Sequence, residues 1–259
     1  MARILSFVFA ILLIVVPSSQ SQSQDAVGLL KSSLAALGGG QRQLPVTYLA
    51  LGLQTDLRSG TSDASSPIQI EALVPDKFLS VVRAPSGPVT TVVNGKFGQV
   101  RTSSGKESVS ATQVSGTTTA SVPIFVLSKL LSAPTMRAYL VGQETLNGQL
   151  VNHIAVRGLL GIPLNQQLAG DGYEVYTDPQ SALPVRLRIY QAVKNTFVAP
   201  SLKGFVTIDI TFSDYQPVSG FQFPLHLTWA ADGRDLYSVQ LSAIQVNAPV
   251  NASDFSLGE

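Results

Sequence analysis

The residues of this sequence best suited to acid–base or metal chemistry are two histidines and a few scattered carboxylates. His153 lies in QLVNHIAV, and His226 lies in SDYQPVSGFQFPLHLTW, residues 213–229, together with Asp214 and Tyr215. Two imidazoles and a distant carboxylate could in principle bind a metal ion. Both histidines, however, fall in alternating strand patterns, and apolar residues share the predicted face of His153. We therefore expect two strand side chains, with His153 partly buried and hydrogen-bonded, and no metal site.

A pair of carboxylates for acid–base catalysis is only weakly indicated. Asp171 and Glu174 would point to opposite faces of a strand, and Asp178 precedes a proline in a predicted turn. Asp209 lies on the polar face of its predicted strand. The sequence contains no serine-hydrolase elbow, zinc-peptidase motif, phosphate loop or dinucleotide-binding fingerprint. We therefore predict a protein without catalytic residues or a cofactor. The least favoured alternative is an enzyme in which carboxylates far apart in the sequence come together in the folded structure.

The composition is apolar and poor in charge. Hydrophobic residues make up 45% of the 259 positions and charged residues 13%, whereas about 25% charged is usual. The absence of cysteine excludes a lipid-modified cysteine, disulfides, cysteine metal sites and a thiol nucleophile. The sequence has 17 basic and 16 acidic residues and no basic cluster. We therefore expect neither binding to nucleic acid nor strong electrostatic attachment to anionic lipid.

Residues 1–24 have the order of a secretory signal peptide. Arg3 supplies the positive charge, residues 4–16 form an apolar run, and small and polar residues follow. The run is shorter than the roughly 18–20 residues that span a bilayer, and a retained anchor is the alternative. The expected cleavage follows Ser19, Ser21 or Ser23. We predict a periplasmic or secreted bacterial protein, a single mature domain over 25–259, and no stable transmembrane segment after cleavage.

Two segments have helical spacing of apolar residues. The first is expected to begin at Asp25 as N-cap and to end at glycines 38–40. The second, 121–133, is expected to be capped by Ser121, with Pro123 in its first turn. The polar, Ser/Thr-rich stretch 102–120 before it is predicted to be a loop.

The rest of the chain alternates between apolar and polar residues, which is typical of antiparallel strands with one buried face. Clear examples are 68–74, 183–189 and 205–212. Turn dipeptides for two-residue hairpins separate such segments. They are Asn94-Gly95, Asn147-Gly148 and Asp232-Gly233. We therefore predict a mainly β (α+β) fold of about ten strands, in a strongly curved sheet that forms a half-open barrel with helices over its concave face.

Residues 213–229 are predicted to form part of a hairpin. Asp214 and Tyr215 would belong to the connection, and Gly220 would supply the turn. Pro224 suggests a sheet edge or a bulge, because it has no donor for the ladder. The aromatic face of the following strand would then point to the apolar side.

Six short segments carry a recognisable series of motifs. They are VPDKFLSVV (74–82), VVNGKFGQV (92–100), LVGQETLNGQLVNHIAV (140–156), TDPQSALPVRLRI (177–189), SDYQPVSGFQFP (213–224) and NAPVNASDFSL (247–257). Their types and order resemble the periplasmic outer-membrane lipoprotein carrier superfamily (LolA-like and LolB-like). The resemblance implies a half-open barrel with a helical lid and an apolar cavity for acyl chains, and binding without bond-making. The chain differs in length from dedicated carriers, so a lipoprotein cargo is not implied.

Eight apolar residues are candidates for such a cavity, with plain core packing as the alternative. The lid candidates are Phe125, Leu127, Leu130 and Leu131, and the wall candidates are Phe221, Phe223, Leu227 and Trp229. The leading hypothesis is an exported protein that holds a lipid, an acyl chain or an acylated protein. The alternative is an envelope sensor or protein–protein interaction module that uses the same fold to bind a protein partner.

Overall fold

The computed structural model describes residues 19–38, 46–58, 65–95, 97–110, 121–158, 172–193 and 204–258. This part of the chain forms one antiparallel sheet of 13 strands, two α-helices and a short 3-10 helix. The predicted mainly β fold with two helices is confirmed, with 13 strands instead of about ten. None of the helices in these ranges has the length and hydropathy needed to cross a membrane. Most of the predicted signal peptide lies outside the described residues.

The elements follow the chain in two runs of strands with a helix between them. The helices are α1 (Ser19–Ala36), α3 (Pro123–Ser132) and η3 (Ala252–Phe255). The first strands are β1 (Thr47–Asp56), β2 (Ser65–Leu73), β3 (Lys77–Ala84), β4 (Gly87–Asn94), β5 (Phe97–Thr102) and β6 (Gly105–Ser110). The later strands are β7 (Arg137–Leu146), β8 (Gln149–Arg157), β9 (Gly172–Thr177), β10 (Pro184–Val193), β11 (Gly204–Val218), β12 (Phe221–Ala231) and β13 (Arg234–Val246).

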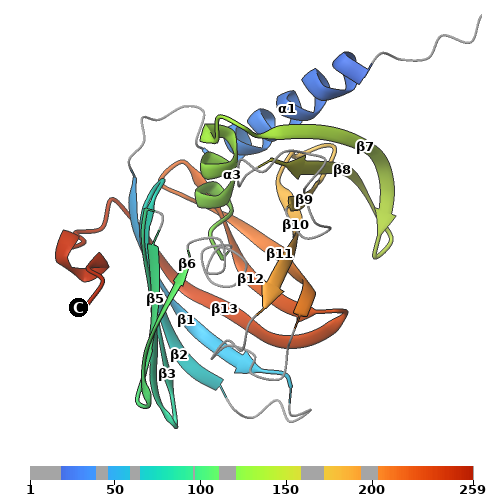
Figure 1. Cartoon of the computed structure of the whole chain (residues 1–259). Helices are drawn as coiled ribbons and strands as arrows, with labels where there is room; N and C mark the ends of the chain where they lie inside the picture. Colours follow the sequence, from blue (N-terminus) through green and yellow to red (C-terminus); the bar gives the residue numbers. More distant parts are fainter. Residues whose placement is uncertain are drawn as a thin grey trace, which may run out of the picture.

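The sheet is a pair of meanders joined at its centre. Its order is β6-β5-β4-β3-β2-β1-β13-β12-β11-β10-β9-β8-β7, so the last strand pairs with the first. Within the described residues the two terminal strands of this order, β6 and β7, are not paired with each other. Figure 1 shows the β1–β6 run and the β7–β10 strands on opposite sides of α3, with α1 beside β7.

Local turn chemistry accounts for the hairpins. Asn147 and Gly148 have φ of 52° and 83°, and Asp232 and Gly233 have φ of 47° and 76°. Such paired positive φ angles suit two-residue hairpin loops. In the β4–β5 hairpin the positive φ falls on Gly95. All three predicted hairpins are confirmed.

Strand alternation builds one apolar core. The predicted inward residues of β2 and β11 are buried, and they join a single cluster. These residues are Ile68, Ile70, Ala72, Val206, Ile208, Ile210 and Phe212. The core therefore lies on one face of the sheet, where α1 and α3 also contribute buried side chains.

Three predicted boundaries are wrong. The helix α1 begins at Ser19 instead of at Asp25, because no proline or glycine in between interrupts it. The N-cap of α3 is Val122 instead of Ser121, since the helical conformation is disfavoured for a residue that precedes proline. The predicted loop 102–120 contains strand β6, which pairs with β5. Residues 111–120 lie outside the described residues.

The 213–229 segment differs from its prediction in one respect. Asp214 and Tyr215 lie within β11, not in the connection before a strand. Asp214 has φ of 57°, and β11 stays paired with β12 on both sides of it, so it continues as one strand as far as the turn. The turn is formed by Ser219 and Gly220, as predicted for the latter. Pro224 pairs with Tyr215 of β11, and the register with β13 begins only at His226, so Pro224 lies beyond the β12–β13 ladder.

Candidate functional site

The helix α3 is enclosed by the core. All residues from 121 to 128 are buried, so the first half of the helix has no exposed face. A helix that is apolar all round is stable only when it is surrounded. Phe125 is 1% exposed and packs edge-to-face on Phe78 of β3, with ring centroids 6.3 Å apart. In Figure 1 the helix lies between the two runs of strands.

The structure brings the predicted lid and wall residues into one cluster. Phe125, Leu127 and Leu130 of α3 are buried, and Leu131 is partly buried against the same core. The four wall candidates on β12 are all buried there as well. They are Phe221, Phe223, Leu227 and Trp229. Phe223 contacts Tyr48 of β1 edge-to-face, with ring centroids 5.4 Å apart.

Three buried hydroxyl groups near this core have no hydrogen-bond partner in the described part of the chain. They belong to Ser33 of α1, Tyr48 of β1 and Ser128 of α3. Burial raises the pKa of Tyr48 well above its ordinary value. An unpartnered buried hydroxyl costs about 1–3 kcal/mol. The apolar interior therefore contains polar atoms that could still accept or donate a hydrogen bond.

An open groove of about 530 Å³ lies between α1 and the β7–β8 hairpin. Leu29 and Leu140 line it and also pack against the core cluster. Gln143 and Asn152 line it from the hairpin, and the Gln143 amide donates to Asn152 Oδ1 at 3.0 Å. The groove thus has an apolar part continuous with the core and a polar rim.

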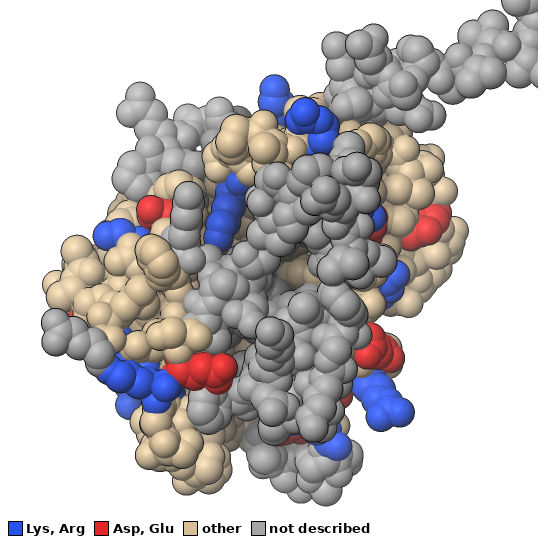
Figure 2. All heavy atoms as spheres, viewed as in Figure 1, with Lys and Arg blue, Asp and Glu red and all other residues tan. Residues whose placement is uncertain are grey.

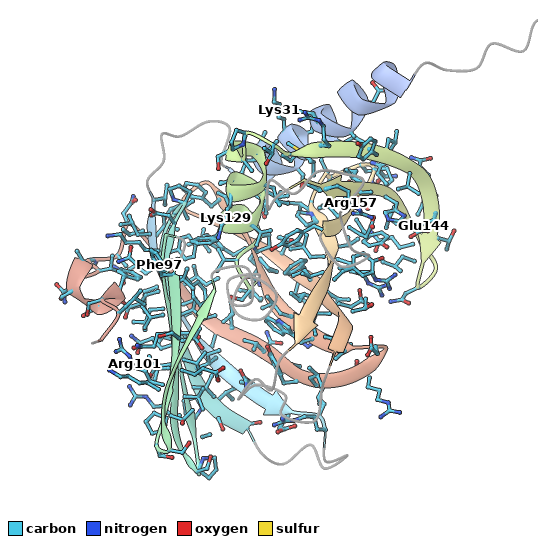
Figure 3. All side chains as sticks on the ribbon, in the orientation of Figure 1. Lys31, Phe97, Arg101, Lys129, Glu144 and Arg157 are labelled. Carbon is cyan, nitrogen blue, oxygen red and sulfur yellow. The ribbon has the colours of Figure 1, made fainter. Side chains whose placement is uncertain are left out.

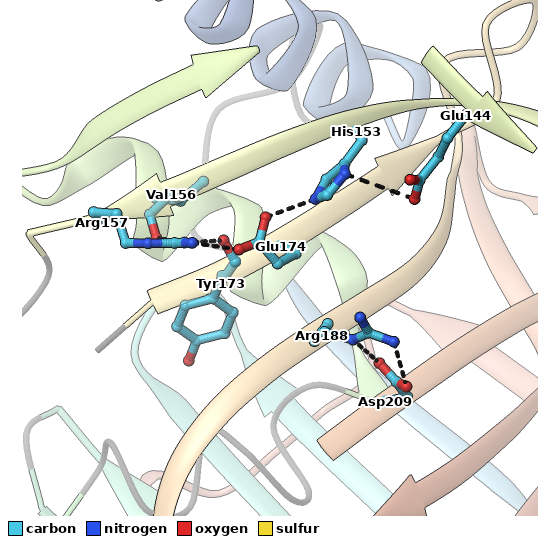
Figure 4. A network of polar contacts seen from close by, with 8 residues as sticks. All are labelled: Glu144, His153, Val156, Arg157, Tyr173, Glu174, Arg188 and Asp209. Atoms are coloured by element: carbon cyan, nitrogen blue, oxygen red, sulfur yellow. Dashed lines mark hydrogen bonds and ion pairs between the residues drawn. The ribbon is translucent and has the colours of Figure 1, made fainter. Parts of the chain in front are cut away.

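A polar cluster occupies the other face of β8–β11 (Figure 4). Glu174, whose side chain is 6% exposed, accepts from Arg157 Nη2 and from His153 Nε2, the latter at 2.7 Å. The His153 ring stacks on Tyr176, with centroids 4.4 Å apart, and its Nδ1 lies 3.6 Å from Glu144. Burial raises the pKa of Tyr176 to about 12. His153 is thus partly buried and hydrogen-bonded, as predicted.

A second ion pair continues this cluster toward the centre of the sheet. Arg188 of β10 donates to both oxygens of Asp209 on β11, at 2.8 and 3.0 Å. This hydrogen-bonded carboxylate raises the pKa of the Arg188 guanidinium. The carboxylates of Glu174 and Asp209 are therefore each engaged by an arginine from a neighbouring strand, which is an arrangement that holds strands together.

The other residues singled out for chemistry are dispersed. His226 lies on β12, with Nδ1 3.3 Å from Ser213 Oγ, and three strands separate it from His153 on β8. Asp178 accepts from the main-chain N–H of Ser181 at 2.7 Å and shapes the turn before β10. Asp171 lies outside the described residues. Within the described ranges, no group of three or more histidine and acidic residues is placed to hold a metal ion.

Sequence reasoning missed one residue of this region. Lys129 is the single charged residue of the otherwise apolar helix PIFVLSKLLS. A lone charge in an apolar helical segment is a signal visible in the sequence. The structure adds that the Lys129 side chain is partly buried.

Comparison with known proteins finds similarity of structure. No protein-family model and no curated protein matches the sequence. A putative outer membrane lipoprotein-sorting protein domain from Vibrio parahaemolyticus matches with a TM-score of 0.58 at 11% identity, over 90% of this chain and 97% of that one. A LolA superfamily protein from Nitrosomonas europaea matches with a TM-score of 0.55 at 9% identity, over 90% and 97%. A DUF1329 family protein from Desulfovibrio piger matches with a TM-score of 0.56 at 9% identity, over 91% and 97%. At these identities the similarity is one of fold.

Proposed function

We propose that this chain, which has the fold of the LolA superfamily, is an exported binding protein for an amphiphile with an acyl chain. The observation that carries the proposal is the position of α3, an apolar helix whose first half is buried against a sheet whose terminal strands are not paired with each other in the described residues. A shift of this helix would uncover apolar side chains on α3 and on β12. Burying an acyl chain against them is worth roughly 0.8 kcal/mol per methylene group. No bond-making is proposed.

Two further features support an amphiphile over a plain hydrocarbon. The groove between α1 and β7–β8 combines an apolar part next to the core with the polar rim of Gln143 and Asn152. The hydroxyls of Ser33, Tyr48 and Ser128, which have no partner within the described ranges, could donate to ester or amide carbonyls of an acylated ligand. A lipid or an acylated protein has both kinds of group.

Export is proposed from the order of charged, apolar and small residues in 1–24. The similarity of fold to a putative outer membrane lipoprotein-sorting domain supports an envelope location. The single domain over 25–259 belongs to the same proposal.

The test is ligand binding by delipidated protein. We expect detergent-free preparations to contain a stoichiometric amphiphile by native mass spectrometry, and the stripped protein to bind the fluorescent methyl ester of cis-parinaric acid. Phe223→Ala should weaken that binding roughly tenfold or more, because a buried phenylalanine contact is worth about 1.5–3 kcal/mol. Phe97→Ala is the matched control, since Phe97 is 67% exposed on β5. No amphiphile in any preparation, and no ester binding, would contradict the proposal.

A second candidate function is recognition of an envelope protein at β7. This terminal strand exposes Tyr139 by 40% and Val141 by 59%, and an exposed strand edge can pair with a segment of another chain. Val141→Lys should then abolish a stoichiometric protein complex without changing ester binding. A complex that survives Val141→Lys, or none in the wild type, would count against this candidate.

A further inference from the structure

Lys129 stands out because its surroundings do not match its charge. It lies in the second half of α3, between the buried Ser128 and the buried Leu130, one turn after the buried Phe125. Its own side chain is partly buried. Figure 3 labels Lys129 beside α3, in the region between the two runs of strands in this view.

Among the residues that the structure describes, the ammonium group of Lys129 forms no hydrogen bond or ion pair. The main-chain carbonyl of Lys129 accepts from the Ser132 hydroxyl at 3.0 Å, whereas the side chains of Arg157 and Arg188 each hold a carboxylate. Burial lowers the pKa of Lys129 from its ordinary value. Asp76 acts in the opposite direction, but it is exposed and makes no ion pair with Lys129.

A partly buried cation without a partner is unfavourable for folding. Removing an ammonium from water has to be offset by a nearby negative charge or by hydrogen bonds. Groups perturbed by burial in this way concentrate at functional sites. The hydroxyl of the adjacent Ser128 is buried and likewise has no hydrogen-bond partner among the described residues. Within this part of the chain, α3 therefore holds two donors without acceptors, beside apolar side chains.

We infer that the ligand carries an anionic head group, a carboxylate or a phosphate, that pairs with Lys129 while its acyl chain contacts the apolar residues of α3 and β12. This inference rests on the proposed function and names the class of amphiphile. Figure 2 shows basic and acidic side chains scattered between uncharged ones on the face in view, with no broad patch of one sign among the described residues.

The test compares an acid with its neutral ester. Delipidated wild type should bind cis-parinaric acid about tenfold more tightly than the methyl ester, because hydrogen bonds between charged partners exceed neutral ones. Lys129→Met should bind both probes with the affinity of the ester. Lys106→Met, which removes an exposed lysine on β6, should keep the wild-type preference. Displacement of the ester by oleate or by oleoyl lysophosphatidate, with monoolein as neutral control, separates carboxylate from phosphate head groups.

The possible results separate the role of Lys129 from the proposed amphiphile-binding function. The inference is overturned if the wild type binds the acid and the ester with equal affinity, or if Lys129→Met still prefers the acid. Either result is compatible with the proposed binding function. Failure of every probe to bind overturns both. Folding of Lys129→Met is checked by its unfolding midpoint, which should equal or exceed that of the wild type, since the substitution removes a partly buried charge.

Discussion

We predict that α3 detaches from the core while the sheet remains folded. Two side-chain truncations, Phe125→Ala and Val239→Ala, should separate this opening from global unfolding. Phe125 loses its contact with Phe78 of β3 as soon as α3 detaches. Val239 is buried on β13, the central strand, and stays packed when α3 alone moves. The two side chains therefore report on different openings, which hydrogen exchange resolves amide by amide.

The magnitudes follow from burial. Phe125→Ala should destabilise the closed form by about 3–5 kcal/mol, of which the aromatic pair with Phe78 accounts for about 0.5–1.5 kcal/mol. Since 1.4 kcal/mol is tenfold in an equilibrium constant, α3 amides should exchange at least about 100-fold faster. Val239→Ala removes two methyl groups, about 2 kcal/mol, and should accelerate the slowest sheet amides about 30-fold while α3 amides keep the wild-type rate.

The assay is native-state hydrogen exchange followed by NMR or mass spectrometry, with α3 and β12 compared in the same sample. In the wild type, α3 amides should exchange with a lower opening free energy than β12 amides. If Val239→Ala accelerates α3 and β12 equally, α3 opens only by global unfolding. The helix would then be a fixed part of the core, and the reasoning behind a movable α3 would be refuted.

Two further predictions concern the polar residues. Glu174→Gln should lower the free energy of unfolding by about 2 kcal/mol in urea titrations, which is less than the loss of a fully buried ion pair costs. The reason is that Arg157 is partly exposed and keeps two main-chain acceptors, while His153 loses a charged acceptor. A change below about 0.5 kcal/mol would contradict the structural role of the cluster. Asp178→Ala should lower the free energy of unfolding by about 1 kcal/mol at pH 7, because it removes the hydrogen bonds that Ser181 donates to the carboxylate. These bonds lower the pKa of Asp178, so the difference in free energy of unfolding from the wild type should be full above pH about 4 and shrink as the pH falls through the folded-state pKa. A difference that persists unchanged at pH 2 would exclude this cause.

Much of the fold could be predicted because its causes are local. Alternation of Ile68, Ile70 and Ala72 sets which face of β2 is apolar, whatever lies opposite. The dipeptides Asn147-Gly148 and Asp232-Gly233 favour positive φ and so favour hairpins by themselves. Boundaries were less predictable, because they depend on competition between neighbouring residues.

The candidate site was predictable only in its residue types. The apolar face of α3 and the aromatic face of β12 follow from periodicity, and both are buried in the structure. Periodicity does not say which elements face each other, so contacts such as Phe125 with Phe78 could not be derived. The engagement of Glu174 by Arg157 and His153 depends on the register of β8 against β9, which joins residues far apart in the sequence.

The sequence by itself thus determined the strand-rich, cysteine-free character of the chain, its hairpins and its apolar faces, because these depend on residues within one turn or strand. Only the tertiary structure decided that β13 pairs with β1, that the first half of α3 is buried, and that Lys129 is partly buried without a counterion among the described residues. The free energy of a charged side chain depends on the groups that surround it in space. Segments far away in the sequence supply these groups, so the residues next to Lys129 in the chain cannot predict them.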